Sequence, residues 1–216
     1  MPETYSDGYL ALPRAGRGPG VLVVHAWWGL NSFFKALCRR LAGRGFVALA
    51  PDLYHGQVAA TVDEAKRLRS QLSQREAAAR LQLATEALCG LEAVTCPVVG
   101  VVGFSLGARF GLELSIARPK DIGAVVVFYG SSQANYAPAR AAYLGHFAET
   151  DPWQAASGVK KLEKSLRTAG RPVEFYTYPG TGHWFFEKDR ADAYAADAAR
   201  LAWQRTVKFL QATLAP

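Results

Sequence analysis

The chain has 216 residues, of which half are hydrophobic and 20% are charged, a composition that fits one domain over residues 1–216 with a sizeable core. Its polar start lacks the apolar run of a signal peptide, and no stretch nears the ~18 consecutive apolar residues of a membrane span, so we expect a soluble, cytoplasmic protein with no membrane partner. The formal net charge of +7 is spread along the chain without long runs of like charge, so we expect no nucleic-acid partner.

Short apolar runs alternate with amphipathic helical patterns along the chain. In chain order, the pattern predicts a strand at 21–27, a helix at 31–43, a strand at 46–53, a helical region at 61–92, a strand at 97–104, a helix at 106–118, strands at 123–130 and 141–149, a helix at 159–169, a strand at 172–178 and a final helix from about 189. Asn31 suits a helix N-cap, and Thr61 with Glu64 is a capping-box signature that opens one broken helix or two. Apolar strands between amphipathic helices predict an α/β fold with a doubly wound, mostly parallel sheet.

The three cysteines, Cys38, Cys89 and Cys96, do not form a disulfide framework or a zinc-binding pattern. We expect reduced thiols that are buried or half-buried. A thiol-based enzyme is an alternative that needs one of them at the active-site crevice. All three fall on predicted helices or at the start of a strand, which disfavours this alternative.

A serine with flanking glycines follows one of the predicted strands. Gly103-Phe104-Ser105-Leu106-Gly107 comes after the strand at 97–104 and opens the next helix, which is the strand–turn–helix setting of a nucleophile elbow. The glycines allow a sharp turn that strains the serine backbone and lifts its hydroxyl above the sheet. We interpret Ser105 as a nucleophile; the alternative is an N-cap serine in a glycine-lined turn.

A histidine and two acids follow the last two predicted strands. The chain order serine, acid, histidine is that of α/β hydrolases, so we expect His183 to be the general base. Glu149 and Asp151 compete for the role of orienting the imidazole, and Asp151 is favoured because Pro152 fixes the turn that follows it. The alternatives are a surface-loop histidine and solvated loop acids.

Acyl transfer needs two N–H donors aimed at the developing oxyanion. The predicted donors are the backbone N–H groups of Leu106, which follows the serine, and of Trp27, which follows the first buried strand.

We expect the substrate pocket to be walled by aromatic side chains near the strand ends: Trp28, Tyr54, Trp184 and Phe185. Core packing is the alternative for these aromatic residues. No metal ion or organic cofactor is expected.

Five runs of the sequence resemble the dienelactone hydrolase family of α/β hydrolases. They are HAWWGLN (25–31), APDLY (50–54), GFSLGA (103–108), GHFAETDP (145–152) and YPGTGHWFF (178–186). The resemblance covers nearly the whole chain and implies an α/β-hydrolase fold without a large lid domain. It also implies a triad of Ser105, Asp151 and His183, with Trp27 and Leu106 as oxyanion donors.

The chain departs from the founding members of that family at three positions. They use cysteine where this chain has Ser105, glutamate where it has Ala26, and a substrate-binding arginine where it has Glu187. A serine hydroxyl needs deprotonation by His183 during attack, whereas a thiol can be held as a thiolate by charged neighbours. The loss of the arginine argues against a dicarboxylate-like dienelactone as the natural substrate.

These observations predict a serine hydrolase that cleaves small carboxylic esters or lactones through an acyl-enzyme. We expect a small-molecule substrate and a protein that is a monomer or a homodimer. The alternative is a non-catalytic, ligand-binding member of the same fold.

Overall fold

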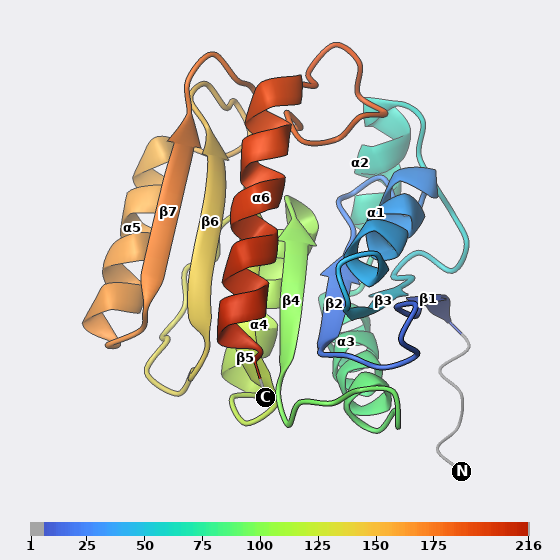
Figure 1. Cartoon of the computed structure of the whole chain (residues 1–216). Coiled ribbons are helices and arrows are strands. Elements are labelled where there is room, and N and C mark those ends of the chain that lie inside the picture. Colours follow the sequence, from blue (N-terminus) through green and yellow to red (C-terminus); the bar gives the residue numbers. More distant parts are fainter. Residues whose placement is uncertain (1–6, 216) are drawn as a thin grey trace.

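The computed structural model describes residues 7–215, through which runs a seven-stranded sheet (Figure 1). In sheet order, its strands are β1 (Gly8–Ala11), β3 (Val47–Pro51), β2 (Gly20–Val24), β4 (Val99–Phe104), β5 (Ile122–Phe128), β6 (Ala142–Ala148) and β7 (Val173–Tyr178). Neighbouring strands from β3 to β7 are parallel, and β1 pairs antiparallel with β3 at one edge. The predicted mostly parallel sheet is confirmed.

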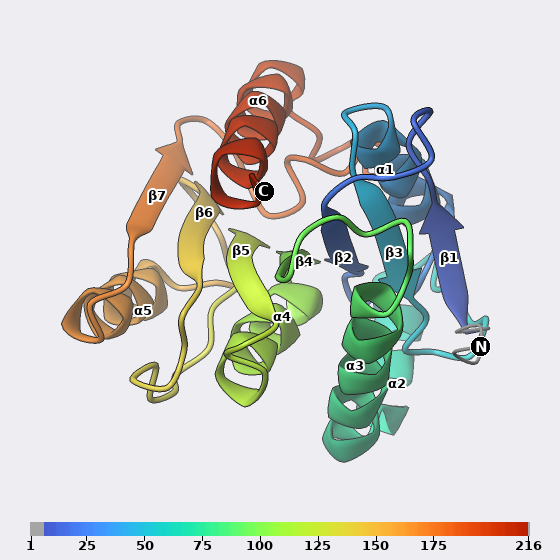
Figure 2. The same cartoon turned by 60° about the horizontal axis from the view of Figure 1, so that its bottom comes forward.

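Helices cover both faces of the sheet: α1 and α6 lie on one face, and α3, α4 and α5 on the other (Figure 2), while α2 lies above α3 in the view of Figure 1. Their bounds are α1 (Ser32–Ala42), α2 (Val62–Gln71), α3 (Gln74–Cys89), α4 (Leu106–Ala117), α5 (Ala156–Thr168) and α6 (Ala196–Thr213). Every residue of β2, β3 and β4 is buried, as expected for parallel strands between two helical layers. Within residues 7–215, no lid domain interrupts these elements, so the doubly wound fold is also confirmed.

Local polar contacts explain where several helices begin. The side chain of Asn31 accepts hydrogen bonds from two backbone N–H groups in the first turn of α1. Thr61 and Glu64 make both hydrogen bonds of a capping box at the start of α2. The region 61–92 forms two helices, and Ser73 caps the second by accepting from a first-turn N–H. These three helices therefore start at a residue whose side chain satisfies otherwise unpaired donors.

Two elements differ from the sequence-based expectation. The pattern does not predict β1, because four residues with mixed burial carry little periodic signal. The final helix begins at Ala196 and not near Asp189, so that prediction is wrong. Residues 184–194 instead form successive turns, in which the Glu187 N–H donates to the carbonyl of Trp184 and the Arg190 N–H to that of Glu187.

The predicted domain 1–216 includes residues 1–6, the first part of the polar start, and Pro216. These residues lie outside the described part of the chain. Among residues 7–215, no helix combines the length and the apolar character needed to cross a membrane.

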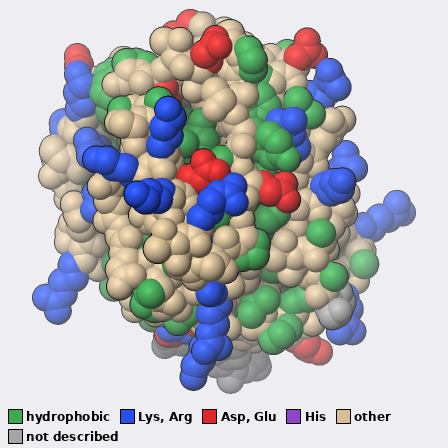
Figure 3. All heavy atoms as spheres, turned by 90° about the vertical axis from the view of Figure 1, so that its left-hand side faces the viewer, with side chains coloured by type: hydrophobic (Ala, Val, Ile, Leu, Met, Phe, Trp, Pro, Cys, Tyr) green, Lys and Arg blue, Asp and Glu red, His purple; other side chains and the backbone are tan. Residues whose placement is uncertain are grey.

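The face beside α5 and β7 carries lysine and arginine side chains separated by uncharged and acidic ones (Figure 3). Positive charge on this face is dispersed, as the sequence predicts, and forms no continuous patch there.

His146 on β6 joins the sheet to α6 through buried polar contacts. Its Nδ1 lies 2.8 Å from the Tyr178 hydroxyl and its Nε2 lies 3.0 Å from the Thr206 hydroxyl. Burial lowers the pKa of His146 to about 3, and the positive charge of Arg205 acts in the same direction. The unfolded chain takes up this proton below about pH 6.5, so the folded protein loses stability as the pH falls from about 6.5 towards 3.

We expect His146→Gln to make folding less sensitive to acid. Over this pH window, the free energy of unfolding of the wild-type chain should fall by up to about 1.4 kcal/mol per pH unit more than that of the variant. Urea denaturation at a series of pH values measures the two slopes. Identical slopes would contradict the assignment of a buried, neutral imidazole.

Candidate active site

Ser105 lies in the sharp turn between β4 and α4, with backbone angles of φ 50° and ψ −109°. A positive φ is strained for a residue with a side chain and persists only where the surrounding structure imposes it. The Ser105 N–H donates a 2.9 Å hydrogen bond to the carbonyl of Phe128 at the end of β5. The Ser105 hydroxyl makes no capping hydrogen bond to α4, so it does not act as a side-chain cap.

The glycines around Ser105 permit this turn because the neighbouring backbone leaves no room for a side chain. A Cβ atom at Gly103 would lie 2.4 Å from the carbonyl oxygen of Gly107, and one at Gly107 would lie 2.2 Å from that of Val24. A Cβ atom at Gly130 would lie 2.5 Å from the carbonyl oxygen of Ser105. These close approaches bring β2, β4 and the end of β5 together around the serine.

A continuous chain of hydrogen-bond contacts joins the three predicted side chains. Nε2 of His183 lies 3.1 Å from Oγ of Ser105, and Nδ1 lies 2.7 Å from Oδ2 of Asp151. The other carboxylate oxygen accepts from the N–H groups of Trp153 and Gln154, at 2.8 and 2.9 Å, which fixes its orientation. The side chains of His183 and Asp151 are only 4% and 5% exposed, so solvent hardly competes for these contacts.

Glu149, the other acid considered from the sequence, lies outside this chain of contacts. It is exposed, and its carboxylate accepts a 2.9 Å hydrogen bond from the N–H of Gly180. A second link joins the same two loops, because the Thr150 N–H donates to the carbonyl of Thr181 at 3.1 Å. Glu149 therefore ties down the loop that carries the histidine, while Asp151 contacts the imidazole itself.

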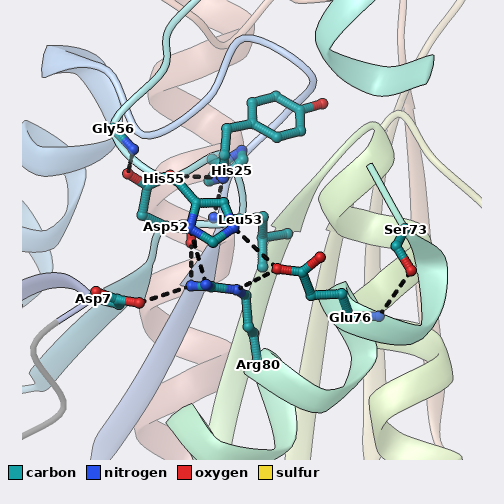
Figure 4. A network of polar contacts seen from close by, with 10 residues as sticks. Asp7, His25, Asp52, Leu53, His55, Gly56, Ser73, Glu76 and Arg80 are labelled. Atoms are coloured by element: carbon teal, nitrogen blue, oxygen red, sulfur yellow. Dashed lines mark hydrogen bonds and ion pairs between the residues drawn. The ribbon is translucent and has the colours of Figure 1, made fainter. Parts of the chain in front are cut away.

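His25 connects the loops that follow β2 and β3. Its Nε2 accepts a 3.1 Å hydrogen bond from the N–H of Leu53, and its Nδ1 lies 2.7 Å from the carbonyl oxygen of Ala26. Burial lowers the pKa of His25, which favours the neutral ring with its proton on Nδ1. Arg80 of α3 supports the same region, with a guanidinium nitrogen 3.0 Å from Nδ1 of His55 (Figure 4). This network holds the backbone that leads into Trp27.

The predicted oxyanion donors, Trp27 and Leu106, both border the space in front of Ser105. No backbone carbonyl among residues 7–215 accepts from either N–H group. Leu106 is the first residue of α4, where backbone N–H groups are free and the helix dipole is positive. The arrangement therefore leaves two backbone donors available beside the serine.

A cavity of about 190 Å³ opens in front of Ser105 and His183. It is lined by Trp27, Arg69, Ser105, Leu106, Arg109, Tyr129, Gly130, Ser131, Trp153, Gln154 and His183. Pockets for drug-sized ligands are typically ~300–1,000 Å³, so this cavity suits a smaller molecule. Its lining combines aromatic faces with two guanidinium groups.

The family model of the dienelactone hydrolase family matches residues 6–214. The chain belongs to the dienelactone hydrolase family. It is 33% identical over 213 residues to "Protein usf" of Aquifex pyrophilus, covering 94% of this chain and 92% of that protein. It is 32% identical over 216 residues to a "Putative carboxymethylenebutenolidase" of Aquifex aeolicus (strain VF5), covering 96% and 93%.

A solved structure described as a putative dienelactone hydrolase from Klebsiella pneumoniae subsp. pneumoniae MGH 78578 matches the fold with a TM-score of 0.83. The two chains are 25% identical, and the match covers 94% of this chain and 91% of the other. The predicted family, the α/β-hydrolase fold and the enzyme class, a hydrolase of carboxylic esters, are thereby confirmed.

Several residues that line the cavity were not expected from the sequence. Arg109 lies one helical turn after Ser105 on α4, so helical spacing is a signal that predicts it. Arg69 reaches the cavity from α2, and no local pattern indicates this. Trp153, which is 50% exposed, packs edge to face on Trp27 with ring centroids 4.9 Å apart. The tertiary packing of α2 and of the loop after β6 therefore places three of the eleven lining residues, Arg69, Trp153 and Gln154.

The four aromatic residues predicted to wall the pocket do not line this cavity. Trp28, Tyr54 and Phe185 are buried in the core, in line with the core-packing alternative. The guanidinium of Arg190 covers the ring of Trp28 at 3.6 Å from its centroid. Trp184 stacks behind Trp27, with ring centroids 6.1 Å apart. These rings support the cavity wall from behind and do not form it.

None of the three cysteines reaches the cavity, and all three are free thiols. Cys38 and Cys96 are buried, whereas Cys89 is exposed, so the expectation of burial is wrong for Cys89. Burial raises the pKa of Cys38 to about 12, which disfavours a reactive thiolate there. The thiol-based alternative therefore lacks a thiol at the site.

Glu187 is fully buried beside the site and does not line the cavity. Its Oε1 accepts a 2.6 Å hydrogen bond from the hydroxyl of Tyr129. Burial raises the pKa of Glu187 to about 8; the charge of Asp189 adds to this rise, whereas the Tyr129 hydrogen bond and the charge of Arg190 oppose it. Near neutral pH the carboxyl group therefore keeps its proton.

We expect Glu187→Gln to change how stability depends on pH. The unfolded chain releases this proton above about pH 4.5, whereas the folded chain keeps it until about pH 8, so the wild-type protein loses stability as the pH rises through this window. Relative to the variant, its free energy of unfolding should fall by up to about 1.4 kcal/mol per pH unit. Denaturant melts between mildly acidic and mildly alkaline pH measure this, and parallel curves for the two proteins would refute it.

Proposed function

We propose that this protein is a serine hydrolase that cleaves small carboxylic esters or lactones through an acyl-enzyme on Ser105. The observation that carries the proposal is the unbroken series of contacts from Oγ of Ser105 through His183 to Asp151, at 3.1 and 2.7 Å. A hydroxyl, an imidazole and a carboxylate in this order supply a nucleophile, a general base and the group that orients the base.

The hydrogen bonds select the imidazole tautomer that the reaction needs. The Asp151 carboxylate accepts the Nδ1 proton of His183, which leaves the Nε2 lone pair directed at the Ser105 hydroxyl. Ser105 attacks the ester carbonyl while Nε2 takes its proton, and the N–H groups of Trp27 and Leu106 stabilise the oxyanion. His183 then protonates the departing alkoxide, which leaves an ester on Ser105. Water attacks this ester by the same route and releases the acid.

The cavity favours small substrates that carry a negative charge. Its volume is about 190 Å³, and Arg69 and Arg109 both line it. The sequence-based argument against a dicarboxylate-like dienelactone rested on the loss of an arginine at position 187, which is a buried glutamate that does not line the cavity. Arg69 and Arg109 supply positive charge to the cavity from other elements. We therefore extend the proposal to short esters or lactones whose acyl group bears a carboxylate.

We expect Ser105→Ala to lower kcat for a short p-nitrophenyl ester by at least about 10³-fold, because it removes the hydroxyl that lies 3.1 Å from Nε2 of His183. A fluorophosphonate should label the wild-type protein on Ser105 and leave the variant unlabelled. Ser115→Ala is the control, since that buried hydroxyl of the same helix α4 bonds to Leu112 and Tyr143. Full activity in Ser105→Ala, or an adduct on another residue, would disprove the mechanism.

We expect Arg69→Ala to raise KM for an ester with a carboxylated acyl chain by about three- to tenfold, and to leave KM for a neutral ester of the same length unchanged. The effect should shrink as salt is added, because Arg69 is exposed. Arg67→Ala, an exposed arginine of the same helix that does not line the cavity, is the matched control. Equal changes for both esters would exclude a role of Arg69 in charge recognition.

A cytoplasmic location and a monomeric or homodimeric state remain part of this proposal on the basis of sequence alone. The second candidate, a non-catalytic ligand-binding protein, would be favoured if the wild-type chain hydrolysed no ester in a broad panel and Ser105 stayed unlabelled.

A further inference from the structure

Behind the histidine lies a buried contact that the mechanism above does not use. Tyr129 follows β5 directly, has a positive φ of 39° and is only 1% exposed. Its hydroxyl donates a 2.6 Å hydrogen bond to Oε1 of Glu187, which has no exposed surface. No group among residues 7–215 forms a hydrogen bond with Oε2 of Glu187. Burying a carboxyl group with a single hydrogen bond lowers the stability of the fold, so the position of Glu187 calls for an explanation.

We propose that Tyr129 and Glu187 are positioning residues that hold the imidazole of His183 against Ser105. The inference rests on the proposed function and adds two residues to it. The ring of Tyr129 lies against the ring of His183, with centroids 4.7 Å apart and planes tilted by 54°. The phenol ring therefore backs the imidazole on one side, while its hydroxyl points to Glu187.

The pair connects the rigid sheet to the loop that carries the histidine. Tyr129 is fixed in the sheet, because its N–H donates to the carbonyl of His146 at 2.8 Å. Phe128, the residue before it, accepts from the N–H of Ser105. Glu187 comes four residues after His183, at the end of a turn in which its N–H donates to the carbonyl of Trp184 at 2.8 Å. The Tyr129–Glu187 hydrogen bond thus closes the histidine loop onto the strand end that also holds the nucleophile.

The histidine loop needs such a tie. It contains Gly180 and Gly182, which restrict the backbone little, and Trp184 has a positive φ that only the surrounding structure can maintain. Proton transfer from the Ser105 hydroxyl requires the imidazole within hydrogen-bond reach, and displacement by about 1 Å costs up to about 10²-fold in rate. A substrate-binding role for Glu187 does not fit, because its carboxyl group is buried away from the cavity.

The test compares Tyr129→Phe, Glu187→Leu, the double variant and Glu187→Gln. Tyr129→Phe keeps the ring on His183 and removes only the hydroxyl, and Glu187→Leu removes the acceptor. Each should lower kcat for a short p-nitrophenyl ester, and the rate of fluorophosphonate labelling, by about tenfold, with KM within about twofold of wild type. The double variant should be no slower than either single one, because both break the same contact. Glu187→Gln keeps an acceptor oxygen and should recover most of the lost rate.

Tyr143→Phe is the matched control. Tyr143 is also buried, and its hydroxyl lies 2.8 Å from that of Ser115 at the opposite end of β6 from the site. It should lower the melting temperature about as much as Tyr129→Phe does, but leave kcat at the wild-type value.

The outcomes separate this inference from the proposed function. If the wild-type chain labels on Ser105 and Tyr129→Phe reacts at the same rate, the positioning role is overturned and the serine mechanism stands. The same conclusion follows if Tyr143→Phe lowers kcat by the same factor as Tyr129→Phe. It also follows if the fold-decreases in kcat of the two single variants multiply in the double variant. Absence of labelling in the wild-type chain would overturn both.

Discussion

Close approach of backbone to backbone at the end of β4 is the constraint on which the site depends. Ser105 adopts a strained conformation because β2, the start of α4 and the end of β5 converge on it, and they converge because Gly103, Gly107 and Gly130 have no side chains. The same turn presents the hydroxyl to the cavity and leaves the first N–H of α4 free. One packing arrangement therefore supplies both the proposed nucleophile and one proposed oxyanion donor.

The remaining groups of the site come from loops, and contacts between loops hold them in place. Glu149 and Thr150 tie the loop after β6 to the loop after β7, which brings the Asp151 carboxylate to the imidazole of His183. Placing reactive groups on loops over a rigid sheet is a common arrangement, since the sheet supplies precision and the loops supply reach. Here hydrogen bonds between the loop after β6 and the loop after β7 restrict both of them.

Two buried ionisable groups oppose each other in their effect on stability. His146 resists protonation and destabilises the fold as the pH falls below about 6.5, whereas Glu187 resists ionisation and destabilises it as the pH rises above about 4.5. Their effects partly cancel between these values. Since Glu187 is neutral around pH 7, the carboxylate of Asp151 is the acidic group that acts on His183 there. The Tyr129–Glu187 contact thus adds no negative charge beside His183 near neutral pH.

Local sequence patterns are sufficient for the strands, most of the helices, the elbow at Ser105 and the order of the three reactive side chains. Periodicity, capping residues and the turn preferences of glycine act over a few neighbouring residues, so they can be read without coordinates. The sequence favours Asp151 over Glu149 through the turn at Pro152, but such patterns cannot place Arg69 at the cavity, pair Tyr129 with Glu187 or decide that Trp28 and Phe185 lie in the core. Those outcomes depend on which loops and helices pack together across the sheet, and contacts between distant segments leave no periodic signal in either one.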